Sequence, residues 1–177
     1  MQSLLTSGFD SLLNIPVISR IRRNHGLEHA TLHILAQRFP ALPMAGHSTV
    51  AGFRLMGELS TEAVQSAVEE ALRRLQAGEA KLAVHPNCGT NFVTAGTLSG
   101  LAGAVSMLGA GRRTRDKLER LPLAAVLATL ALIAAYPLGL KLQEKVTTSG
   151  KPGTLQVTEI KVTRHGSLTV HHVLTQG

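Results

Sequence analysis

Two long runs without a charged residue limit most strongly how this chain can fold. They extend over residues 92–111 and 121–140, and the second run is rich in Leu and Ala. About 20 apolar residues in a helix are enough to cross the hydrocarbon core of a bilayer. Because only the short basic segment 112–120 joins the runs, we expect a two-helix transmembrane hairpin. A helical hairpin buried inside a soluble protein is the alternative.

The hairpin makes the lipid bilayer the first expected partner. On the first run, Gly96 and Gly100 lie about one helical turn apart, and such small residues let helices approach closely in lipid. A protein partner or a homo-oligomer through this Gly-rich helix is a further expectation. Lys and Arg flank both ends of the runs, so they do not set the orientation. Since we recognise no secretory signal, we expect the inner membrane, with the soluble domain in the cytoplasm.

Composition argues against two other classes of protein. The formal net charge is +7, but aromatic residues make up 3% of the chain and Trp is absent. We therefore expect no nucleic acid partner, because single strands are bound largely by base stacking. Anionic lipid headgroups account better for the positive charge. Cys88 is the single cysteine, which excludes a disulfide scaffold.

The remaining sequence predicts a small α/β (α+β) domain with a four-stranded sheet. Ser60 is a suitable N-cap, and an apolar stripe follows it until Gly78. This pattern predicts a helix between two short strands, a β-α-β unit. Alternating apolar residues near the C-terminus predict a β-hairpin around Gly166. The expected strands cover residues 53–59, 81–84, 155–163 and 167–174.

These elements divide the chain into three expected segments. They are 1–91 with the motif helix and the β-α-β unit, 92–140 with the transmembrane hairpin, and 141–177 with a linker and the β-hairpin that completes the first domain. In that β-hairpin, a three-residue loop pairs Val162 with Leu168, whereas a two-residue loop pairs Val162 with Thr169. The first register keeps apolar residues opposite each other. Residues 3–15 have the pattern of a short amphipathic helix or of a packed arm.

One stretch concentrates chemically active side chains, and it reads His25-x-x-Glu28-His29. The stretch lies in a helical pattern that begins near Pro16 and ends before Pro40. Positions i, i+3 and i+4 share one face of a helix, so the two imidazoles and the carboxylate converge. Because the rest of this face is apolar, the polar groups need a partner. A divalent metal such as zinc is a suitable one.

A second group of candidate ligands is His85-x-x-Cys88, in the turn-rich segment after the expected strand 81–84. This spacing lets a histidine and a cysteine reach one metal ion across a turn. His33, one turn after His29, is a reserve ligand. Three further histidines are interpreted as surface or strand residues and not as ligands: His165, His171 and His172.

Two resemblances attach to these residues. The stretches Asn24–Thr31 and His85–Asn91, with the hydrophobic pair after them, resemble an uncharacterised family of bacterial membrane proteins of unknown function. The five residues His25–His29 are also similar to the inverted zinc motif of pitrilysin-type metallopeptidases. That resemblance implies that both histidines bind zinc and that the glutamate activates water. Nothing in the chain matches the later Glu that is the third ligand in those peptidases.

Three hypotheses remain open. In the first, Zn²⁺ is held by both motif histidines and by His85 or Cys88, and Glu28 is the general base of a small membrane-bound metallohydrolase, a candidate zinc metallopeptidase. In the second, all four ligands close a structural metal site that Glu28 supports from outside. In the third, no metal binds, and the cluster is a hydrogen-bonded interface. Under the last two, the chain is a non-catalytic membrane or complex-assembly protein.

Overall fold

The computed structural model describes residues 11–166 and 168–177 of the chain. It separates into two compact units, residues 1–85 with 144–177 and residues 86–143. The first unit contains α2 (Pro16–Arg38), β1 (Ala45–Thr49), β2 (Gly52–Met56), α3 (Thr61–Gln76), the 3₁₀ helix η1 (Ala80–Ala83), β3 (Gln156–His165) and β4 (Leu168–Gln176). The second contains α4 (Gly89–Ser106), α5 (Thr114–Leu118) and α6 (Leu121–Leu142), and the π-helical turn η2 (Gln143–Thr147) follows α6.

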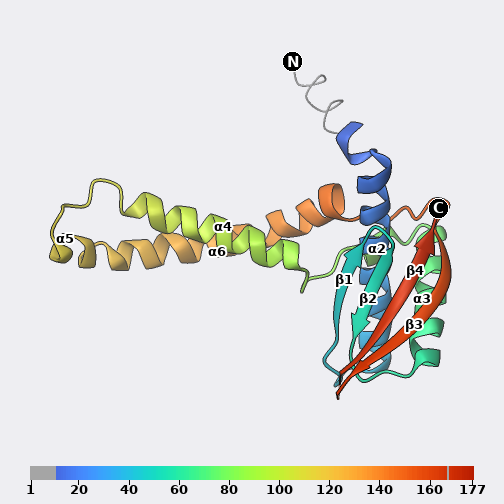
Figure 1. The fold of residues 1–177 in the computed structure, drawn as a ribbon. Helices are drawn as coiled ribbons and strands as arrows, with labels where there is room; N and C mark the ends of the chain where they lie inside the picture. Colours follow the sequence, from blue (N-terminus) through green and yellow to red (C-terminus); the bar gives the residue numbers. More distant parts are fainter. Residues whose placement is uncertain (1–10, 167) are drawn as a thin grey trace. The chain divides into compact units, whose positions relative to one another are not determined.

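The first unit is an α+β layer structure, which confirms the expected four-stranded sheet. Its strand order is β1-β2-β4-β3, and every neighbouring pair is antiparallel. Helices α2 and α3 lie behind the sheet in the view of Figure 1. Most of the predicted helix over residues 3–15 lies outside the described residues.

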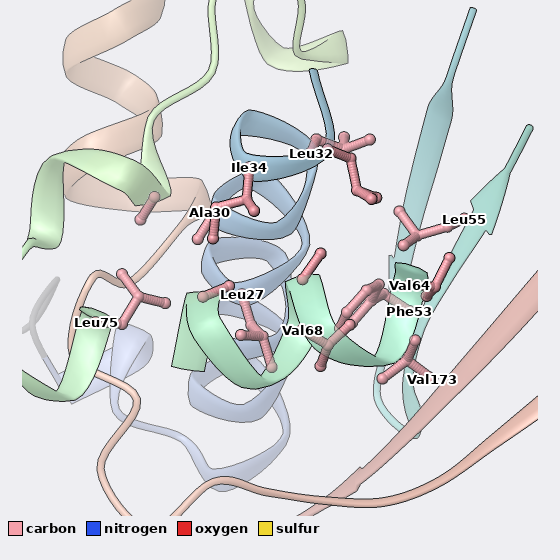
Figure 2. Close-up of a cluster of buried hydrophobic side chains, with 14 of the residues drawn as sticks. Leu27, Ala30, Leu32, Ile34, Phe53, Leu55, Val64, Val68, Leu75 and Val173 are labelled. Carbon is pink, nitrogen blue, oxygen red and sulfur yellow. The ribbon is translucent and has the colours of Figure 1, made fainter. Parts of the chain in front are cut away.

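The apolar core of this unit lies between α2, α3 and the sheet, as Figure 2 shows. Helix α3 begins as predicted, because the Ser60 side chain accepts a hydrogen bond from the backbone N–H of Ala63. Its apolar residues recur at helical spacing, so one side of the helix faces the core. The most deeply buried members of the cluster include Leu27, Leu35, Phe53, Val64, Val68 and Val173.

The predicted β-α-β unit is wrong, because the expected strand 81–84 begins as the 3₁₀ helix η1. The strands that pair with β2 are instead β1, which precedes it in the chain, and β4 near the C-terminus. The carbonyls of Ala83 and Val84 accept hydrogen bonds from the imidazoles of His29 and His33. These carbonyls are therefore satisfied by side chains of α2, and a strand partner is not needed to satisfy them.

The C-terminal β-hairpin forms, but with neither of the predicted registers. Val162 lies opposite His171 and Ile160 opposite Val173. The turn contains Gly166, whose φ of +63° is the left-handed conformation that favours glycine. Val173 is fully buried in the core, and a shift of one residue would move it to the other face of the sheet. Core packing, which the local sequence does not reveal, accounts for this register.

In the second unit, α4 and α6 run side by side and α5 lies in the connection between them (Figure 1). Among the described residues, one helical segment, 114–147, is long and apolar enough to cross a membrane, with a mean hydropathy of 2.1 in its most apolar window. Helix α4 ends at Ser106 and does not reach that apolarity, since glycine and hydroxyl residues dilute its apolar ones. The structure therefore supports one candidate span, where the sequence predicted two.

Candidate metal centre

Four histidines gather in the first unit. His25, His29 and His33 follow each other at one-turn intervals on α2, and His85 follows η1. The ring centres of His25 and His29 are 4.3 Å apart, and those of His29 and His85 are 5.7 Å apart. His33 and His85 have ring centres 4.7 Å apart. The structure therefore brings three predicted ligands together with the reserve ligand.

The polypeptide backbone fixes the tautomer of three of these imidazoles. Nδ1 of His25 lies 3.0 Å from the carbonyl oxygen of Thr147, and Nδ1 of His29 lies 2.8 Å from that of Ala83. A carbonyl oxygen only accepts, so each Nδ1 carries the proton and each Nε2 carries the lone pair. His33 has the opposite tautomer, because its Nε2 donates to the carbonyl oxygen of Val84 at 2.8 Å. Such hydrogen bonds to the second ring nitrogen are typical of histidines that bind metals.

The spacing of the rings suits one tetrahedral ion. With a metal–nitrogen bond of about 2 Å, an imidazole centre lies about 3 Å from the ion, so two ligand rings have centres about 5 Å apart. The separations of 4.3 and 5.7 Å among His25, His29 and His85 lie on either side of this value. One ring nitrogen of His25 and one of His29 lie within 4.8 Å of each other. The ring spacings of the two pairs His25–His29 and His29–His85 are therefore compatible with ligands of a shared metal ion.

His85 has the protonation state that a ligand needs. Burial, together with the neighbouring imidazoles of His33 and His29, lowers the pKa of His85 from its ordinary 6.5 to about 4. Its ring is therefore neutral at physiological pH. Neutral imidazole is the form that binds a metal ion.

The carboxylate of Glu28 lies on the side of α2 that faces strand β1. It is 4% exposed, and Ser48 on β1 donates a hydrogen bond to one of its oxygens. Burial raises the pKa of Glu28, while the hydrogen bond from Ser48 and the nearby His25 and His47 act in the opposite direction. A raised pKa makes a buried carboxylate a stronger base than an exposed one.

Two residues of α2, Asn24 and Gly26, hold the helix against the segments that surround the site. The Asn24 amide is fully buried, donates to the carbonyl of Thr49 at 2.9 Å and accepts from the hydroxyl of Thr175. Gly26 lies so close to the carbonyl of Ser149 that a side chain at this position would clash. A larger residue would therefore push away the segment whose Thr147 holds His25. Both positions belong to the sequence stretch around the motif.

Two contributors to the site were missed by the sequence analysis, and both lie on β1. Ser48 orients the Glu28 carboxylate, and Gly46 leaves room for it, because a Cβ at this position would overlap the carboxylate. The segment Ala45–Thr49 contains glycine, histidine and serine and little apolar alternation. It therefore carried no strong strand signal. Only the pairing of β1 with β2 places these residues beside α2.

The prediction that Cys88 is a ligand stays a prediction. Cys88 is the residue before α4 in the second unit, and its sulfur accepts a hydrogen bond from the backbone N–H of Thr90. Among the described side chains, His171 and His172 make no ring contact with the four clustered histidines. His171 is a strand residue as interpreted, but it is buried, and His172 contacts the hydroxyl of Thr163 on β3. The side chain of His165 lies outside the described part of the chain.

Comparison with known proteins finds similarity to proteins without an assigned activity. A family described as "Domain of unknown function (DUF6391)" matches residues 20–160. An uncharacterised protein of Picosynechococcus sp. is 37% identical over 139 residues, which cover 73% of this chain and 66% of that relative. The chain thus spans somewhat less than two thirds of this relative's length. No solved structure matches the chain.

Proposed function

The chain belongs to the DUF6391 family, a family of unknown function, and we propose that it is a membrane-bound zinc protein. In this proposal, His25 and His29 hold the ion together with His85, and Glu28 is the general base. The proposed reaction class is hydrolysis, with a peptide bond as the candidate target. One observation carries the proposal: two adjacent imidazoles on α2 are fixed by backbone carbonyls so that both bear the Nε2 lone pair.

The chemistry follows from the residues that surround the proposed ion. A zinc ion with three protein ligands and an open position lowers the pKa of bound water to about 7. If zinc binds, it would supply an acidified water, and Glu28, held by Ser48, would be the base that takes the proton of this water and passes it to the leaving group. Its buried position and raised pKa support this role. His33, with its ring beside that of His85, restricts the orientation of that ligand.

Cys88 is the alternative to His85 as third ligand. This part of the proposal rests on the His85-x-x-Cys88 spacing alone. If both residues coordinate together with the two histidines of α2, the site is closed and structural. Hydrolysis then separates the two forms of the proposal, because only an open site supports reaction.

We also propose that the second unit anchors the protein in the inner membrane as a transmembrane hairpin, with the first unit in the cytoplasm. Only 11% of the most apolar window of segment 114–147 is buried in the structure, which supports contact with lipid. A side chain added at Gly96 or Gly100 would meet nothing within 4 Å. This face of α4 is therefore available to a protein partner or to a second copy.

Elemental analysis of the purified full-length protein, prepared without chelator, tests the metal. We expect about one zinc per chain in the wild type and a sharp loss in His25→Ala and His85→Ala, since coordination holds the ion. His172→Ala is the matched control, because it removes an imidazole of the same unit outside the cluster. If the wild type carries no metal, the hydrogen-bonded interface becomes the better account.

Glu28→Gln separates the catalytic from the structural form of the proposal. The amide preserves shape and removes the base, so we expect zinc content to persist while hydrolysis of a denatured protein substrate such as casein is lost. Loss of zinc in this variant would make Glu28 a structural support. Hydrolysis that continues unchanged would exclude it as the base.

A further inference from the structure

A groove in the first unit lies between α3 and the edge strand β3, outside the histidine cluster. Its volume is about 530 Å³, and both elements contribute to its lining. Strand β3 ends the order β1-β2-β4-β3, so among the described strands it pairs on one side only. The groove therefore borders a sheet edge whose second row of backbone groups has no strand partner in the described part of the chain.

The beginning of β3 forms one wall of this groove. Leu155, which precedes the strand, and Gln156–Ile160 within it all line the groove. Because β3 is an edge strand, backbone groups without a described strand partner lie along this edge together with these side chains. A ligand in this groove can consequently form backbone hydrogen bonds as well as side-chain contacts.

A β-bulge gives the groove an apolar floor. The bulge lies between Val157 and Glu159, and it shifts the alternation of the strand by one residue. Val157 and Ile160, which a regular strand would direct to opposite faces, are as a result both half-buried and both line the groove. Across from them, α3 contributes the half-buried Leu72. Apolar side chains of a ligand can pack against this floor.

The charges at the groove oppose the charge of the whole chain. Glu69 on α3 and Glu159 on β3 line it, and no Lys, Arg or His is among its described lining residues. The chain as a whole has a formal net charge of +7. Lys161 contacts Glu159 at 3.1 Å, but both side chains are largely exposed, so this pair yields readily to a competing cation. A basic ligand is therefore favoured.

We propose that the α3–β3 groove binds an extended, basic peptide segment of another protein, which adds to β3 as a further strand. Backbone pairing with β3 supplies affinity, and the alternate side chains of the peptide enter the apolar floor, as in other cases of strand addition beside a helix. A Lys or Arg of the peptide lies near Glu69. The inference uses no residue of the histidine cluster and stands whether or not zinc binds.

Selection of phage-displayed random decapeptides on the detergent-solubilised full-length protein tests this proposal. We expect enriched sequences with alternating apolar residues and at least one Lys or Arg. The enriched peptide is then synthesised with a fluorescent label and titrated by anisotropy. N-methylation at alternate peptide positions should abolish binding, because it removes the strand hydrogen bonds. No enrichment, enrichment of acidic peptides, or equal binding of the methylated peptide would overturn the proposal.

Charge reversal at the groove supplies a matched pair of variants. Glu69→Lys should weaken binding of the enriched peptide about fivefold or more, as expected for loss of an exposed ion pair and the new repulsion. Glu58→Lys changes the net charge equally at an exposed site outside the groove, and should leave the affinity unchanged. If both variants weaken peptide binding equally, the effect comes from the net charge of the protein and not from Glu69 in the groove, which would contradict the proposal. A concentration-dependent dimer that the peptide dissociates would identify a second copy as the occupant instead.

Discussion

The two units of this protein use similar apolar residues in opposite ways. In α3, the buried residues Val64, Val68 and Leu75 lie on one side, and charged residues such as Arg73 cover the other. In α6, Leu, Ala, Val and Ile occur around the whole circumference, and only Ala135 and Gly139 are buried. A one-sided stripe is typical of a helix between a core and water, whereas an apolar surface all around is typical of lipid contact.

The same contrast applies to polar groups. The first unit buries Asn24, Glu28 and His29, and each has a hydrogen-bond partner that an element distant in sequence provides. In the second unit, the hydroxyls of Thr94 and Thr129 donate to carbonyls of their own helices, although the buried Gln143 amide donates to Asn91 on α4. Tertiary structure therefore organises the polar chemistry of the first unit, while these helices satisfy their hydroxyl groups locally.

The largest expected difference between the units concerns aromatic side chains. Phe53→Ala should lower the free energy of unfolding of the first unit by about 3–5 kcal/mol, because Phe53 is 2% exposed in the core. Phe92 lies on α4 and is 68% exposed. Phe92→Ala should therefore change the free energy of unfolding of the second unit by less than about 0.5 kcal/mol. Thermal unfolding in detergent, followed by circular dichroism, measures both. Equal losses would contradict the distinction between a buried core residue and an exposed residue of the second unit.

Introducing a charge tests the second unit. Leu130→Lys places an ammonium near the middle of α6, where membrane insertion costs about 2.5–3.5 kcal/mol more, and should reduce the fraction that resists carbonate extraction. Leu118→Lys is the matched control in α5, with nearly the same exposure, 57% against 58%. Release of the wild type by carbonate would show that the second unit is not inserted in the membrane, and the proposed anchor would be wrong.

Hydroxyl groups should show a smaller difference. Ser60→Ala removes the N-cap of α3 and should destabilise the first unit by about 1 kcal/mol. Thr129→Ala removes a hydroxyl that bonds to Ala125 within α6, and a near-zero effect is expected because the carbonyl keeps its helical partner. Urea denaturation of both variants measures the difference. A loss at Thr129 as large as at Ser60 would show that α6 depends on that hydroxyl.

A different kind of effect, a change in pH dependence, is expected at His85. Its pKa of about 4 in the folded chain lies below the ordinary 6.5, so between these values the unfolded chain binds a proton that the folded chain does not. Stability of the metal-free protein should therefore be complete above pH 6.5 and fall as the pH approaches 4. His85→Asn should flatten this part of the profile of melting temperature against pH. An unchanged profile would mean that His85 titrates alike in both states.

Local sequence was sufficient for several features. The spacing of His25 and His29 placed both imidazoles on one face of α2, since helical periodicity fixes which residues are neighbours. Ser60 marked the beginning of α3 by a hydrogen bond to a residue three positions away. The apolar run that became α6 was recognisable from composition alone. All of these depend on contacts within a few residues.

Long-range contacts decided the rest. The segment 81–84 looks like a strand by composition, yet its carbonyls are used by His29 and His33, which lie about 50 residues away in the chain. Strand β1 has weak local preference and exists through its pairing with β2, and only this pairing brings Ser48 to Glu28. The sequence by itself determined the candidate ligands and helix faces, because helical geometry is periodic. Strand pairing, hairpin register and the partners of the buried polar groups were decided by tertiary structure, because their hydrogen bonds join residues that no local pattern relates.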